Sequence, residues 1–256
     1  VLHIILALLF AWINETISPG SVLAYFGIAA MFLIMANVQF IFFVHTNHHV
    51  FLKEHARGLY SAYTNYTVFS VPLYILKTIN AVIFACVSWA IMDVDSSPET
   101  FGFVILSFIA LVIAGTMLSE IVIFSSPDMR SSYVTIPAMA FMEFVTSGLF
   151  LKAGSFPNWL RPWVPSVSLI RWIMQATFIC VYDGNTEAFP PFSALGTDYS
   201  LYDGYISLFG WGGKTKWYCF YMLLVNIAIF RFFCLLSSAY SAFQSKGTHK
   251  VSIDEE

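Results

Sequence analysis

Three histidines near residue 45 have the side-chain type and the spacing to bind a metal ion. His45, His48 and His49 form an HxxHH pattern, a spacing that membrane di-iron enzymes such as desaturases use at the ends of their membrane helices. Such sites need several histidine boxes, but this chain has six histidines in total, and the other three are isolated. The pattern makes a membrane metalloenzyme an alternative function, and we expect no metal site.

A second pattern, Gly212-Gly213-Lys214-Thr215, resembles the end of a phosphate-binding loop. The complete GxxxxGK[ST] pattern needs a glycine five residues before Gly213, but Leu208 occupies that position. We therefore expect a turn followed by the basic start of a helix, and no ATP site in this chain. The sequence also lacks a GxSxG pattern for a catalytic serine, so it predicts no catalytic site.

Four ionisable residues interrupt otherwise apolar stretches: Lys77, Glu120, Glu143 and Arg231. Charges at membrane depth are costly and usually face the bundle interior, a wet cavity or one another. Glu120 lies about one turn from the end of its predicted helix, where it would reach the membrane interface. Glu143 lies deeper, and two roles stay open for it: a structural ion pair or packing contact, and a conformational relay or substrate path.

The composition places these residues in a membrane protein. Hydrophobic residues make up 58% of the 256-residue chain and charged residues 11%, whereas soluble domains carry about 25% charged residues. A soluble fold of this size could not bury so much apolar surface. The net charge of −3 offers no attraction to a nucleic-acid backbone. We expect an all-α, multi-pass protein of the plasma membrane or an organelle membrane.

Six apolar stretches predict six transmembrane helices, separated by turn signals such as Ser96-Ser97-Pro98. The predicted spans cover residues 1–13, 22–44, 68–92, 101–124, 133–151 and 217–243. The first stretch would reach only ~20 Å into a ~30 Å hydrocarbon core. We therefore expect its beginning to be truncated, with further chain upstream.

Residues 158–182 are apolar but interrupted by Pro162 and Pro165, and they are rich in tryptophan, which prefers the membrane interface. We expect short helices that enter the membrane from one side as a re-entrant segment. The polar residues 183–216 that follow predict a long outer loop. Basic residues in the short loops place the tail, residues 247–256, in the cytoplasm, and Asn14 on the outer side as a possible glycosylation site.

Three groups of residues, taken in order, resemble the membrane domain of white-type half-transporters, the G subfamily of ABC exporters. Residues 51–63 resemble the family's ExxxGxY element after the second span. Residues 147–150, 156–160 and 168–172 resemble its SG-, IPxWL- and SxxRY-containing region. The long loop before the last span completes the pattern, and the likeness covers nearly the whole chain, with residues 1–246 as the transmembrane domain.

The resemblance implies roles for particular residues. The element that receives the motion of the ATPase domain would contain Lys53, Glu54, Arg57, Gly58, Tyr60 and Tyr63. Leu149 and Phe150 would form an apolar plug between an inner and an outer cavity. The residues expected to face the substrate cavity are Met31, Met35, Phe141 and Phe144.

The resemblance also implies a transporter that works as a homodimer or as a heterodimer with a related half-transporter. This chain would bind no cofactor. ATP and Mg²⁺ would be bound by a nucleotide-binding domain that precedes the first span in the family. The expected function is ATP-driven export of lipid, sterol or other hydrophobic small molecules by alternating access. Besides the metalloenzyme, a scaffold subunit without transport activity is an alternative.

Overall fold

The described part of the protein is built from helices and turns, and no strand occurs in it. The computed structural model describes residues 19–59, 61–92, 97–126, 128–151, 153–182, 204, 206–207, 209–212 and 214–254. The predicted first span, Asn14 and most of the predicted outer loop lie outside these residues. The expectation of an all-α fold is therefore met over the residues described.

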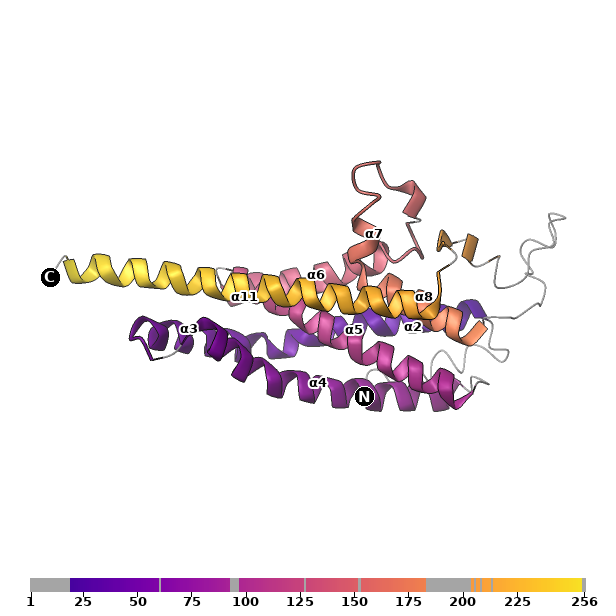
Figure 1. Cartoon of the computed structure of the whole chain (residues 1–256), viewed down its shortest axis with the longest axis horizontal. Helices are drawn as coiled ribbons and strands as arrows, with labels where there is room; N and C mark the ends of the chain where they lie inside the picture. Colours follow the sequence, from indigo (N-terminus) through magenta and orange to yellow (C-terminus); the bar gives the residue numbers. More distant parts are fainter. Residues whose placement is uncertain are drawn as a thin grey trace.

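The elements follow one another along the chain as α-helices with two short 3₁₀ segments. They are α2 (Pro19–Met35), η1 (Ala36–Phe40), α3 (Ile41–Ala56), α4 (Ala62–Met92), α5 (Pro98–Ser125), α6 (Met129–Val145), η2 (Ala153–Ser155), α7 (Val164–Val167), α8 (Leu169–Tyr182) and α11 (Lys216–Asp254). The long helices lie side by side along the longest axis of the molecule, and the segment between α6 and α7 projects from one side (Figure 1).

Four of these helical stretches are long and apolar enough to cross a membrane: Val22–Ala56, Ala62–Ala90, Pro98–Ser125 and Lys216–Phe243. α5 is the centre of the bundle, since it contacts α2, α3, α4, α6, α8 and α11. Each of these contacts covers part of its surface, so α5 is the most buried of the four. α6, with 17 residues, is shorter than the span predicted over residues 133–151.

The segment between the second and third predicted spans is helical over most of its length. α3 continues twelve residues past the predicted end at Val44, and α4 begins at Ala62 instead of at residue 68. The turn between them is a Schellman motif, in which the Gly58 N–H bonds to the His55 carbonyl and the Leu59 N–H to the Glu54 carbonyl. Gly58 has a φ of 79°, which glycine adopts without strain. The helices therefore extend beyond the apolar spans predicted over residues 22–44 and 68–92, because polar residues beside the spans lie on helix surfaces.

The end of α6 also differs from the prediction. The helix ends at Val145, and the Ser147-Gly148-Leu149-Phe150 stretch forms a turn outside it. Gly148 has a φ of 109°. A Cβ atom on this glycine would lie 2.9 Å from Nε1 of Trp211, whose ring is fully buried against the turn. Backbone conformation and packing both stop the helix six residues before the predicted boundary at residue 151.

The buried apolar side chains form two separate clusters. The main cluster joins α2 to α5, α8 and α11 through side chains such as Phe26, Phe108 and Ile173. The second cluster lies around the start of α3 and consists of the following side chains: Ile41, Val44, Leu73, Ile123 and Ile136. α2 and α3 are therefore anchored in different parts of the core.

The Gly148 turn gives a stability prediction. Replacing Gly148 with Ala should destabilise the fold by about 1–3 kcal/mol, because the substitution forces a Cβ into a left-handed conformation and against Trp211. Thermal unfolding in detergent measures the effect. Gly102→Ala is the matched control: its Cβ would contact no atom within 4 Å and it lies in α5, so its unfolding temperature should not fall. Equal stability of the two variants would contradict the prediction.

Candidate functional site

The side chains predicted to face a cavity lie on α2 and α6, two helices that contact each other. Met31 and Met35 are half-buried on α2. On α6, Phe144 is 8% exposed, whereas Phe141 is 57% exposed. The structure therefore brings the predicted cavity residues of α2 and α6 together on one helix pair. Phe141 lies on an outer face of the chain.

The two predicted plug residues lie in the turn after α6. The Phe150 ring packs against the Phe144 ring with centroids 5.4 Å apart, and Phe150 is 65% exposed. Leu149 packs against α2 at Gly27, where its Cδ1 atom lies 3.2 Å from the position that a Cβ would occupy. The turn thus adds an apolar, partly open surface to the α2–α6 pair.

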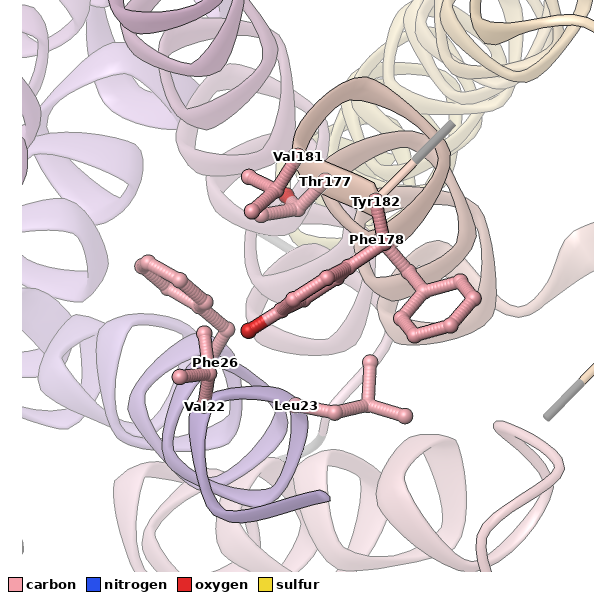
Figure 2. A pocket seen from close by; sticks show the side chains of 7 residues that line it. All are labelled: Val22, Leu23, Phe26, Thr177, Phe178, Val181 and Tyr182. Atoms are coloured by element: carbon pink, nitrogen blue, oxygen red, sulfur yellow. The ribbon is translucent and has the colours of Figure 1, made fainter. Parts of the chain in front are cut away.

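An apolar hollow lies between α2 and α8, away from these residues. Figure 2 shows its lining, which comes from the start of α2 and the end of α8. The lining residues are Val22, Leu23, Phe26, Thr177, Phe178, Val181 and Tyr182. None of the predicted cavity or plug residues is among them, so this hollow and the predicted substrate path are different places.

Glu143 caps a neighbouring helix. Its Oε2 atom accepts a hydrogen bond of 2.7 Å from the Leu169 N–H, the first of α8, and the Ser168 Oγ donates to the Glu143 carbonyl over 3.2 Å. The carboxyl group is buried, and its partners are the backbone and hydroxyl groups where α8 begins. A carboxylate at a helix N-terminus satisfies unpaired amides and the helix dipole. Of the two roles left open, the described contacts support the structural one, through a helix cap instead of an ion pair.

Glu120 joins three helices inside the bundle. Its Oε2 atom accepts hydrogen bonds of 2.8 Å from the hydroxyl groups of both Tyr66 and Tyr74. The two hydroxyl oxygens are themselves 2.8 Å apart, and Cys234 of α11 lies beside the carboxylate. Glu120 is 1% exposed. Two tyrosines of α4 therefore hold the Glu120 carboxylate between the helices, inside the bundle.

Arg231 extends this group toward the surface of α11. Its guanidinium lies over the Tyr66 ring, 4.3 Å from the centroid, and its Nη2 donates to Thr67 Oγ1 over 3.4 Å. A cation over an aromatic face is attracted by the negative face of the ring. Glu120, Tyr66, Tyr74 and Arg231 thus form one polar group, which we call the Glu120 cluster.

Lys77 lies on α4 and contacts the 3₁₀ segment η1. Its ammonium group lies 4.1 Å from the centroid of the Phe40 ring and donates to the Ala36 carbonyl over 3.4 Å. Next to it, the Asn37 side chain donates to the Gly115 carbonyl and accepts from the Thr116 hydroxyl. Asn37 was not among the predicted residues, although an amide side chain within an apolar run was a signal available in the sequence.

The residues of the predicted coupling element lie on the end of α3, the turn and the start of α4. Lys53, Arg57, Gly58 and Tyr63 are exposed, Glu54 is half-buried, and Tyr60 lies outside the described residues. Lys53 and Glu54 belong to α3, and Tyr63 belongs to α4. It presents mainly exposed side chains at one end of the bundle, beside α3 and α4 (Figure 1).

The histidines pack as aromatic rings on α3. The rings of His45 and His49 have centroids 4.7 Å apart, and the His48 ring lies 4.9 Å from that of Phe124 on α5. Among the residues that the structure describes, no group of three or more His, Cys, Asp or Glu is placed to hold a metal ion. The metalloenzyme alternative therefore has no candidate site in this part of the chain.

Of the glycine-rich pattern before the last helix, the structure describes Gly212, Lys214 and Thr215, which lie in irregular backbone ahead of α11. The Thr215 hydroxyl accepts from the Tyr218 N–H over 3.3 Å and so caps the start of α11. The Lys214 ammonium lies over the Tyr218 ring, 4.5 Å from its centroid. The basic residues Lys214 and Lys216 therefore lie at the start of α11, as expected.

Comparison with known families gives one match. Residues 1–182, more than half of the chain, match the family described as "ABC-2 type transporter". No curated protein matches the chain. The matched region includes the predicted cavity, plug and coupling residues as well as Glu120, Glu143 and Lys77.

The Glu120 cluster predicts coupled effects of its two tyrosines. Tyr66→Phe and Tyr74→Phe should each lower the free energy of unfolding by about 1–3 kcal/mol, because each removes a donor from a buried carboxylate. The double variant should deviate from the sum, since both hydroxyl groups serve one oxygen atom. Unfolding in detergent measures the three values. Tyr221→Phe, on the exposed face of α11, is the control, and strict additivity would contradict a shared cluster.

The Glu143 cap predicts different results for two substitutions. Glu143→Gln keeps an oxygen acceptor for the Leu169 N–H and should change stability little, whereas Glu143→Leu removes it and should cost about 0.5–2 kcal/mol. Hydrogen exchange of the first amides of α8 measures the loss locally. If the two variants exchange equally at these amides, the capping role is wrong.

Proposed function

Because the chain belongs to the ABC-2 type transporter family, we propose that it is the transmembrane domain of an ATP-driven exporter of the white-type G subfamily. Membrane domains of this family form the transmembrane part of ABC transporters. They have no ATP site themselves and associate with an ATPase partner and a transported substrate. The chain is accordingly a multi-pass membrane protein. The observation that carries the proposal is the family match together with the ordered ExxxGxY, SG and SxxRY elements.

The proposed topology has six transmembrane helices. α2 to α3, α4, α5 and α11 supply four of them by length and composition. α6 would be the fifth, and residues 1–13 the first. Residues 158–182 would form the re-entrant segment and residues 183–216 the outer loop, with residues 247–256 in the cytoplasm. The short helices α7 and α8 are consistent with a segment that enters without crossing.

The proposed transporter is a dimer, with this chain paired to an identical or related copy. α6 and the turn after it expose large apolar side chains, including Phe141, Met142 and Phe150. A second copy facing this pair would enclose a slit between the two chains. Aromatic and thioether side chains of this kind adapt to varied apolar molecules. Lipids, sterols or other flat hydrophobic molecules are the substrates that fit such walls.

The proposed mechanism is alternating access driven by the ATPase partner, which binds ATP and Mg²⁺. The short turn between α3 and α4 would receive the motion of that partner. Its backbone is fixed by two hydrogen bonds at Gly58 and Leu59. A displacement of the turn would therefore move the adjoining helices instead of being absorbed by a flexible loop. Closure of the inner entrance would then force the substrate past Leu149 and Phe150.

The cavity assignment is tested by two alanine substitutions in the transporter assembled with its ATPase. Phe144→Ala or Leu149→Ala should weaken transport by about ten- to a hundredfold, because an apolar side chain of this size contributes about 1.5–3 kcal/mol to an apolar contact. Transport of a fluorescent lipid in proteoliposomes, measured together with ATP hydrolysis, gives the result. Phe232→Ala, on the exposed face of α11, is the control. Unchanged transport in the Phe144→Ala/Leu149→Ala double variant would remove the assignment.

A further inference from the structure

The second membrane helix changes its winding in the middle. α2 ends at Met35, the five residues Ala36–Phe40 form a 3₁₀ segment, and α3 begins at Ile41. The Ile41 N–H bonds to the Val38 carbonyl, three residues back. Interruptions of a helix usually have a proline, a glycine or an inserted group as their cause. The sequence Ala-Asn-Val-Gln-Phe contains neither proline nor glycine, so the cause lies in contacts with other helices.

Two buried polar side chains supply these contacts, and each involves a different neighbouring helix. Asn37, on the segment itself, donates to the Gly115 carbonyl of α5 over 3.2 Å and accepts from Thr116 Oγ1 over 3.3 Å. Lys77, on α4, donates to the Ala36 carbonyl and lies over the Phe40 ring. Asn37 and Lys77 are 4% and 3% exposed. Buried polar groups of this kind are costly unless they are paired, so the pairs fix the segment in place.

The segment also lies where the core divides. α2 packs in the main cluster, while Val38, Phe40, Ile41 and Val44 pack in or against the second cluster. Each half of the helix packs against α4 and α5 in its own apolar cluster, and at the junction between the halves the contacts of Asn37 and Lys77 add polar links to α5 and α4.

We propose that η1 is a hinge between α2 and α3, and that Asn37 and Lys77 are the positioning residues that hold it in 3₁₀ winding. A 3₁₀ residue turns the helix by about 120° and advances it by ~2.0 Å, against about 100° and ~1.5 Å for an α-helical residue. Conversion of five residues to α-helix would therefore rotate α3 relative to α2 by about 100° and shorten the helix by ~2.5 Å.

The consequence for transport rests on the proposed function. α3 leads into the turn with Gly58, and α2 carries Met31 and Met35. A hinge between them would convert a push on the turn into a rotation of the cavity wall. Asn37 and Lys77 would then control coupling without contacting substrate or ATP.

Distance measurements on the chain itself test the hinge without any need for transport. Nitroxide labels at Ala24→Cys on α2 and Thr46→Cys on α3 report the geometry across η1 in lipid nanodiscs. Cys86 and Cys180 are first replaced, because the other two cysteines are buried. In the Asn37→Leu and Lys77→Met variants, the mean distance between the labels should change by about 2.5 Å or the distribution should broaden by this amount. Lys77→Arg, which keeps a cation over Phe40, should restore the parent distribution.

The matched control is Gln39→Leu, which removes a polar side chain from the same segment at an exposed position. Its distribution should equal that of the parent. A second label pair, Ala24→Cys with Leu106→Cys on α5, should be unchanged in all variants and shows that the bundle is folded. If the distance of that second pair changes in a variant, the test is repeated with Thr116→Val, which removes only one hydroxyl contact to Asn37. Distributions across η1 that match the Gln39→Leu control would reject the hinge.

A second measurement separates the hinge from the proposed function. In the transporter assembled with its ATPase, Asn37→Leu should hydrolyse ATP but transport less substrate per ATP than Gln39→Leu. If the label distances respond and no variant, including the parent, transports substrate, the hinge stands and the proposed function is wrong. If transport per ATP is equal in the two variants despite the change in distance, the role of the hinge in coupling is rejected.

Discussion

Inside a hydrocarbon core, each polar group must find its partner within the protein, because no water is there to replace it. This constraint explains which polar side chains the apolar bundle retains. Glu143 pairs with the first amide of α8, Glu120 with two tyrosines of α4, and Asn37 with the backbone of α5. Each of these contacts joins one helix to another. The polar residues therefore specify how the helices meet, while the apolar residues make insertion favourable.

The central position of α5 follows from the same constraint and from its small side chains. Gly115 contacts Ile34 so closely that a Cβ atom there would lie 3.0 Å from the isoleucine side chain. Close approach of this kind is how helices associate in lipid, where the hydrophobic effect no longer drives them together. The same glycine exposes its carbonyl to the Asn37 side chain. One residue thus permits both the packing and the hydrogen bond between α5 and the second membrane helix.

The sequence predicted the class of the protein and most of its long helices, because both depend on the length and apolar character of continuous stretches. The helix ends were less predictable. α3 continues past Val44 since His48 packs its ring on Phe124, so polar residues there did not mark a loop. The end of α6 depends on Gly148 lying under Trp211, a contact between residues far apart in the chain. The burial of Glu120 has the same origin, since its tyrosine partners lie on another helix.

Of the candidate site, the sequence identified the charged residues but not their partners. Lys77 was recognised as an ion at membrane depth, whereas its contacts with Ala36 and Phe40 require the fold. The predicted cavity residues lie on the α2–α6 pair and the plug residues in the turn after α6, and both groups came from the resemblance to a known family. In the proposed dimer, the surface that they face depends on the second chain, and the sequence of one chain carries little information about that geometry.

The cap that Glu143 provides also bears on how the chain is assembled. α8 has 14 residues and is about 21 Å long, too short to enter the bilayer as an independent span. Its first amide is satisfied by a carboxylate from α6, so this pairing exists only after α6 has been inserted. A change that displaces the end of α6 would therefore also leave the first amide of α8 without its partner.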